Sequence, residues 1–229
     1  MNRALAFAAI LLAIAGGYLL FKLIDRMQTT PESKEDAKVA IEITTATVDE
    51  ETDTYVIDVQ YPQFGIPAID TKIKERIELS ITQFKEDAAA GPPADSALQQ
   101  YEFTSSFDSI YIGPDIISAR IVASSYLGGA HGMSIVNGLN FERVSGRDLT
   151  PLDALALTGL TLEEVAGRAK AELAAKLGGD VIAPEGANPT VENYSTFVID
   201  KDKVTFVFQV YQVAPYAAGP QEVSFERKK

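Results

Sequence analysis

Histidine is the side chain best suited to acid–base chemistry near neutral pH, and this chain contains one, His131. It lies in a glycine-rich segment, residues 126–133 (YLGGAHGM). Catalysis by this histidine would need a nucleophile within hydrogen-bond reach, and Ser124, Ser125 and Ser134 are close in sequence. The chain lacks the G-x-S-x-G, G-x-x-x-x-G-K and H-E-x-x-H motifs. We therefore expect no enzyme, with a hydrolase that uses His131 as the alternative.

A second unusual segment, residues 213–219 (VAPYAAG), also follows a long β-type run. Glycines in the first segment allow positive φ and close backbone approach, so that segment could seat a ligand or the second segment. The alternative is that GGAHG is a structural strand connection whose histidine bonds a backbone carbonyl. The candidate ligand-binding residues are Tyr126, Gly128, Gly129, His131, Tyr211, Pro215 and Tyr216.

The composition argues against a metal site or a cofactor. Cysteine is absent, which excludes disulfides, thiolate chemistry, haem attachment and lipoprotein acylation. A single histidine excludes zinc motifs with paired histidines. Glu163 and Glu164 belong to a predicted helix start and residues 49–53 to an acidic turn, so no carboxylate pair indicates a glycosidase.

The charge restricts the class of partner. The formal net charge is −12, and the first 26 residues are net positive, so the remainder is more negative still. We expect no nucleic-acid partner, because binding nucleic acid requires clustered Lys and Arg. A cationic partner is electrostatically allowed, although a negative surface can also simply keep a protein soluble.

The N-terminus carries an unbroken apolar run over residues 4–21. At about 1.5 Å per residue this run is about 27 Å long, close to the thickness of a bilayer core. We expect an uncleaved signal-anchor that spans the membrane, with the rest of the chain outside the cytoplasm. The alternative is cleavage after Ala13-Ile14-Ala15, which would release the protein. The predicted organisation is a transmembrane helix (1–26), a flexible stalk (27–38) and one domain (39–229).

Two kinds of periodicity predict the elements of this domain. Isoleucines at helical spacing from Ile69 to Ile81 indicate an amphipathic helix that starts near Ala68 and ends before Gly91. Thr161 and Glu164 form a capping box that opens a second helix, which Gly178 closes. Alternating or β-branched runs predict strands over residues 39–47, 54–61, 98–112, 116–126, 134–144, 194–199, 204–213 and 222–226.

The element order β-β-α-β-β-β-α-β-β-β lacks the strict βα alternation of a doubly wound fold. We therefore expect an α+β fold, with one antiparallel sheet covered by two main helices and preceded by the transmembrane helix.

Three segments carry a resemblance to a known family. They are YLGGAHG, then NFERVSGRDLTPLDAL, and finally FVFQVYQVAPYAAG, and together they resemble the RsiV-like C-terminal domain family of bacterial envelope proteins. The N-terminal part of the domain is similar to the accessory region of PdaC-type peptidoglycan deacetylases. The resemblance extends from about residue 39 to residue 225.

The resemblance implies an extracytoplasmic α+β domain, which in RsiV-like members binds lysozyme and is coupled through one transmembrane helix to a sigma-factor-binding tail. Only Met1, Asn2 and Arg3 precede the apolar run, so we expect no anti-sigma role. No deacetylase domain follows Lys229, so we expect no PdaC-like catalysis. The predicted function is a binding domain anchored in the bacterial cytoplasmic membrane, whose ligand is a lysozyme-like cationic protein or a peptidoglycan fragment. A purely structural envelope protein is the remaining alternative.

Overall fold

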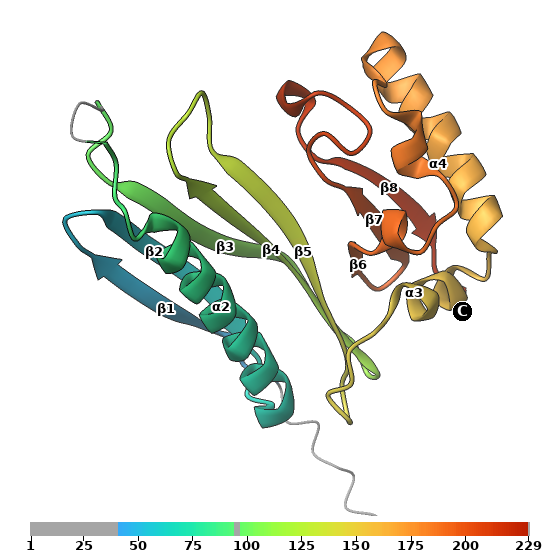
Figure 1. Cartoon of the computed structure of the whole chain (residues 1–229). Coiled ribbons are helices and arrows are strands. Elements are labelled where there is room, and N and C mark those ends of the chain that lie inside the picture. The colour runs from blue at the N-terminus through green and yellow to red at the C-terminus, as the bar shows by residue number, and fades with distance from the viewer. Residues whose placement is uncertain (1–40, 94–96, 229) are drawn as a thin grey trace, which may run out of the picture. The chain divides into compact units, whose positions relative to one another are not determined.

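The computed structural model describes residues 41–93 and 97–228 (Figure 1). The predicted transmembrane helix (1–26) and stalk (27–38) lie outside the described residues. Among the helices that are described, none is both long enough and apolar enough to cross a membrane.

The first half of the described chain forms a five-stranded sheet in the order β1-β2-β3-β4-β5. Neighbouring strands are antiparallel except β2 and β3, which are parallel. The prediction of a purely antiparallel sheet is therefore wrong. The reason is the helix between β2 and β3, which carries the chain back along the sheet and so permits a parallel pair. The strands are β1 (Thr44–Glu51), β2 (Tyr55–Gln63), β3 (Tyr101–Ile112), β4 (Ile116–Tyr126) and β5 (Met133–Glu142).

The helix α2 (Pro67–Ala88) packs on one face of this sheet (Figure 1). Pro67 occupies the first turn, where its missing N–H costs nothing, and Asp70 accepts a hydrogen bond from the Phe64 N–H at 2.7 Å. The predicted isoleucine stripe is confirmed as core, since Ile69 and Ile73 are fully buried. Burial of each such side chain stabilises the fold by about 1.5–3 kcal/mol.

The second half forms a separate antiparallel sheet in the order β6-β7-β8. The prediction of a single sheet is therefore wrong, because each half has its own apolar core and its own covering helices. The predicted capping box at Thr161 is confirmed, and Tyr194 is buried at the centre of this second core. The elements are β6 (Phe197–Ile199), β7 (Lys203–Phe208), β8 (Gln221–Glu226), α3 (Pro151–Thr158), α4 (Leu162–Leu177), and the 3₁₀ turns η1 (Gly178–Asp180), η2 (Pro184–Ala187), η3 (Glu192–Tyr194) and η4 (Tyr216–Ala218).

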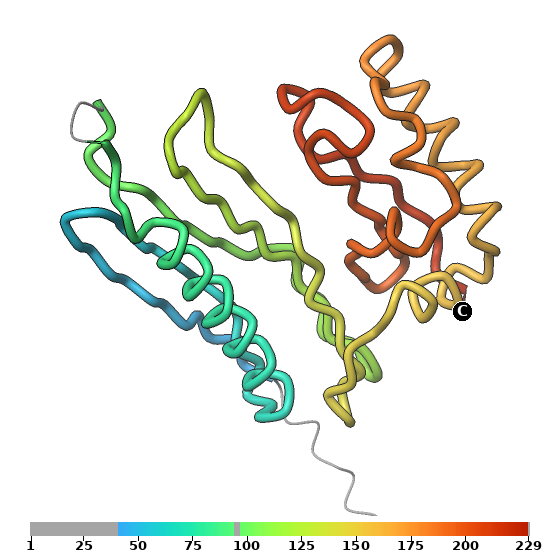
Figure 2. Tube along the Cα trace, viewed as in Figure 1, coloured from blue at the N-terminus to red at the C-terminus, as the bar shows by residue number. Residues whose placement is uncertain are grey.

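Strand β6 lies against the face of β4 and β5 that is turned away from α2, and a buried polar chain fixes it there. The Ser118 hydroxyl donates to the Asn140 side-chain oxygen at 2.7 Å and accepts from the Ile199 N–H at 2.9 Å. The Asn140 amide donates to the Phe197 carbonyl at 2.7 Å. A Cβ at Gly138 would lie 1.7 Å from that same carbonyl oxygen, so this position accepts only glycine. The backbone of β5 therefore comes close to that of β6, and Figure 2 shows the traces of the two sheets beside each other.

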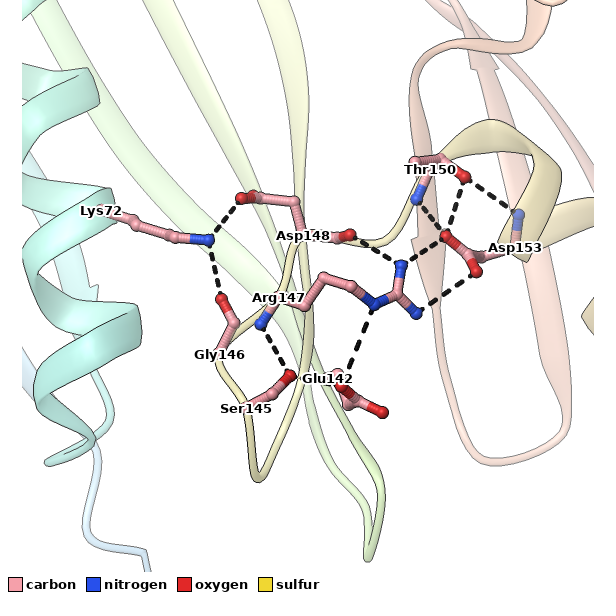
Figure 3. A network of polar contacts seen from close by, with 8 residues as sticks. All are labelled: Lys72, Glu142, Ser145, Gly146, Arg147, Asp148, Thr150 and Asp153. Carbon is pink, nitrogen blue, oxygen red and sulfur yellow. Dashed lines mark hydrogen bonds and ion pairs between the residues drawn. The ribbon is translucent and has the colours of Figure 1, made fainter.

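The connection from β5 to α3 is tied to both halves by charged side chains (Figure 3). Lys72 on α2 donates to Asp148 at 2.8 Å, and Arg76 donates to the same carboxylate. Although burial raises the pKa of Asp148, the bonds from Lys72 and Arg76 bring it below its usual range. Arg147 donates to Asp153 at 2.9 Å, and Asp153 also completes the capping box of α3 with Thr150.

Candidate functional site

The two glycine-containing segments singled out in the sequence meet in the structure. The tip between β4 and β5 carries His131, and the loop between β7 and β8 carries Tyr211 and Tyr216. The His131 and Tyr216 rings stack with centroids 3.9 Å apart and planes 19° apart. The Tyr211 ring lies 5.6 Å from Tyr216 and 6.5 Å from His131. We call these three side chains the aromatic cluster.

Both ring nitrogens of His131 have partners. Nδ1 lies 2.8 Å from the Gly132 carbonyl, which can only accept, so this nitrogen carries the proton. Nε2 is then the acceptor for the Tyr211 hydroxyl at 3.3 Å. The Tyr216 hydroxyl donates to the Gly132 carbonyl as well, at 2.8 Å. One carbonyl therefore fixes the positions of two of the three rings.

The backbone that presents Tyr211 is unusual. Tyr211 has φ of +66°, in the left-handed region that residues with a Cβ seldom adopt. Such a conformation persists only where surrounding contacts hold it, and it is frequent at functional sites. Tyr211 is also 48% exposed, so its ring is available to a ligand.

Two glutamines hold this turn, and sequence reasoning missed both. The Gln209 side chain bonds both the N–H and the carbonyl of Val136 on β5, at 3.0 and 2.7 Å. The Gln212 side chain accepts from the Gln209 N–H at 2.9 Å and donates to the Gly186 and Asn193 carbonyls. Because these bonds end the ladder, β7 stops at Phe208, and the predicted strand over 204–213 is too long. The available signal was two glutamines inside an otherwise apolar run.

The other predicted site residues shape the two loops that carry the aromatic cluster and are not part of the cluster itself. The Tyr126 hydroxyl donates to the Gly129 carbonyl at 2.9 Å across the hairpin tip. Gly128 and Gly129 have φ of +90° and +96°, backbone conformations that residues with a Cβ rarely adopt. Pro215 immediately precedes the 3₁₀ turn η4 that carries Tyr216.

Two of the three serines near His131 in sequence are engaged elsewhere. The Ser124 and Ser134 hydroxyls face each other across β4 and β5 at 2.7 Å. Within residues 41–93 and 97–228, no group of three or more His, Asp or Glu side chains is placed to hold a metal ion. In the cluster itself, His131 and Tyr211 are exposed and Tyr216 is half-buried.

A second hollow surface lies beside α2, where β3, β4 and β5 extend past the helix. Two adjoining pockets of about 390 Å³ each open there, with an apolar floor and a partly polar rim. Sequence periodicity identified what α2 buries, but it gave no signal for which strands the helix leaves uncovered. Both pockets are lined by Leu79, Ser80, Phe103, Ala123 and Asn137.

Two family models match separate parts of the chain. The model described as Deacetylase PdaC matches residues 48–134, and the model described as Protein of unknown function (DUF3298) matches residues 157–228. His131 falls in the first region, while Tyr211 and Tyr216 fall in the second. The aromatic cluster therefore forms where the two matched regions meet.

Among curated proteins, the chain is similar to the peptidoglycan-N-acetylmuramic acid deacetylase PdaC of Bacillus subtilis, with 25% identity over 193 residues. The match covers 82% of this chain and 40% of that protein. The predicted similarity to PdaC-type proteins is thus confirmed. The similarity to the RsiV-like family stays a prediction.

Two solved structures share the fold. A DUF3298 family member from Bacteroides fragilis matches with a TM-score of 0.51 and 20% identity, over 82% of this chain and 90% of that one. A DUF3298 family protein from Pseudomonas aeruginosa matches with a TM-score of 0.54 and 18% identity, over 82% and 94%. At this level of identity the likeness is one of fold, and it supports the two-sheet α+β architecture.

Proposed function

We propose that this protein is a non-enzymatic, extracytoplasmic binding domain that holds peptidoglycan fragments on the aromatic cluster. The observation that carries the proposal is the stack of His131 and Tyr216, 3.9 Å apart, beside the exposed Tyr211. Ring faces suit the apolar faces of sugars, and the Tyr211 hydroxyl gives the cluster a polar group for orientation. Hydrogen bonds already fix the backbone of this loop, so less conformational entropy is lost when a ligand binds.

The same contacts favour binding over hydrolysis. A serine hydrolase needs a serine hydroxyl bonded to its histidine base, whereas among the described residues Nε2 of His131 bonds the Tyr211 hydroxyl and Nδ1 the Gly132 carbonyl. The Ser124 and Ser134 hydroxyls bond each other at 2.7 Å.

The similar Bacillus subtilis protein is named as a deacetylase of peptidoglycan N-acetylmuramic acid, and this name supports peptidoglycan fragments as the ligand class. This chain spans 40% of that protein's length, so the deacetylase activity is not carried over. We propose the same setting, the bacterial envelope, with the N-terminal apolar run as membrane anchor.

A lysozyme-like cationic protein is the second candidate ligand. The net charge of −12 favours it, because a negative surface attracts cationic partners over long range. The predicted RsiV-like resemblance points to the same partner.

Calorimetric titration of the full-length protein in detergent with soluble disaccharide-peptide muropeptides tests the proposal. We expect Tyr216→Ala to weaken binding at least about tenfold, or about 1.4 kcal/mol, because the stack is lost. Tyr216→Phe is the matched control, since it keeps the ring and removes only the hydroxyl bond to Gly132. A parallel titration with lysozyme separates the two ligands. Absence of muropeptide binding contradicts the glycan assignment.

A further inference from the structure

The five-stranded sheet has two edges, and they differ. At β5, the Gln209 side chain covers the backbone of Val136. At the other edge, β1 pairs with β2 and with no other strand of the described residues. An uncovered edge strand offers backbone donors and acceptors to an incoming strand.

The register identifies which β1 residues offer these groups. The Thr54 carbonyl accepts a hydrogen bond from the Tyr101 N–H at 2.8 Å. The backbone N–H and C=O groups of even-numbered residues of β2 therefore point towards β3. Each even-numbered β2 residue therefore forms a non-hydrogen-bonded pair with its partner on β1. In such a pair the backbone N–H and C=O groups of the two residues point away from each other, so those of the β1 partner point to the open edge. These partners are Thr45, Thr47, Asp49 and Glu51.

The side chains of these residues lie on the sheet face opposite α2 and give it a negative charge. Asp49 is directly opposite Asp58, and Glu51 and Glu102 flank Val56 in register. All four carboxylates are exposed, and none forms an ion pair with another described residue. Arg120, which lies on the same sheet face, is engaged by Asp108 and Glu222.

The α2 side of β1 is different in character. Ala46 and Val48 are half-buried and pack at the margin of the first apolar core, while Glu50 at the end of this face is neutralised by Lys85 on α2. A strand added beyond the middle of β1 would therefore meet Ala46 and Val48 on one face and carboxylates on the other. Side chains of a strand alternate between faces, so the complementary segment alternates as well.

We propose that β1 is a docking edge for an extended segment of a partner protein in which Lys or Arg alternates with apolar residues. Backbone bonds to β1 supply affinity, as in other strand-addition complexes, and the alternating pattern supplies specificity. A second copy of this chain is disfavoured because it would bring more carboxylates to a face that already lacks countercharges. The aromatic cluster takes no part, so the edge site and the glycan site stand or fall separately.

The test uses the full-length protein and a labelled peptide with four Lys-Val repeats, matched in length to the eight residues of β1. Fluorescence anisotropy is measured at low salt and at about 0.15 M salt. A Glu-Val peptide and a block peptide of four lysines followed by four valines are the controls. We expect the alternating basic peptide to bind and both controls to bind at least about tenfold more weakly.

Two variants locate the contact. Thr47→Pro removes one outward N–H while leaving the β1–β2 bonds intact, and proline is tolerated at such edge positions. It should weaken the peptide about tenfold or more, whereas Asp49→Asn should weaken it and flatten its salt dependence. His131→Ala should leave the affinity unchanged, and circular dichroism verifies that each variant is folded. Unchanged affinity in a folded Thr47→Pro variant, no binding of the alternating peptide, or self-association of the chain that Thr47→Pro abolishes would each overturn the proposal.

Discussion

At the scale of single residues, Gly138 sets how closely the two sheets approach. A Cβ there would lie 1.7 Å from the Phe197 carbonyl oxygen, which is backbone and cannot rotate away. We expect Gly138→Ala to lower the free energy of unfolding by about 3 kcal/mol or more. Gly167→Ala is the control, because Gly167 lies in α4 with open space around its Cβ position, and it should gain about 1 kcal/mol. Urea unfolding of both variants measures the difference, and equal effects would contradict this account.

Asp153 gives a second residue-scale prediction, on the pH dependence of stability. The bond from Arg147 and those from Thr150 lower the pKa of Asp153 from 3.8 to about 2. A carboxylate with a lowered folded-state pKa stabilises the protein above pH 3.8, and this stability is lost as the pH falls towards 2. Because the group is partly exposed, we expect Asp153→Asn to cost about 1 kcal/mol at pH 7. Thermal unfolding from pH 2 to 7 should show the difference between wild type and variant shrinking at the acid end. A constant difference would contradict the assignment.

The site residues could be predicted in part. Glycines and an isolated histidine stand out in an alternating sequence, so the two loops were found. Tyr211 was selected as a candidate, but its left-handed backbone depends on hydrogen bonds from Gln209 and Gln212 to Val136, Gly186 and Asn193. Those partners are distant in sequence, and no local pattern indicates them.

At the scale of elements, α2 illustrates what periodicity predicts well. Its stripe is set by the helix period alone, and Ile73 is fully buried while Leu79 is 70% exposed. We expect Ile73→Ala to cost about 2–5 kcal/mol, because it leaves a cavity in a packed core. Leu79→Ala removes a similar side chain from the surface and should change stability by less than about 0.5 kcal/mol. Chemical unfolding curves measure the stability of both variants. Similar midpoints for the two would show that α2 is packed in another orientation.

The helix α3 was missed because eight residues give too few turns for a clear period. The sequence nevertheless contains a signal for its start, since Thr150 and Asp153 form a capping box and Pro151 lies in the first turn. The parallel pairing of β2 with β3 was missed for a different reason. Strand patterns report which residues are buried, but not which strands are neighbours.

At the scale of the whole molecule, the division into two sheets was the main error. Both halves present alternating strands and one long helix, a pattern that fits one large sheet or two small ones. Which of the two arrangements forms depends on contacts such as the hydrogen bond from Asn140 to the Phe197 carbonyl. Through this bond β6 packs on the face of the first sheet and does not extend its backbone hydrogen bonding. The consequence for function is direct, because this contact brings the tip of one sheet against a loop of the other and so assembles the aromatic cluster.

Binding of peptidoglycan fragments by the aromatic cluster can be measured directly, because the chain has a single histidine. The His131 Cε1–H signal is the only one of its kind in a proton NMR spectrum of the chain. It is titrated with a disaccharide-peptide muropeptide in wild type and in Tyr216→Ala. We expect a saturable shift in the wild type that is lost in the variant. A signal that stays fixed in the wild type throughout the titration would contradict it.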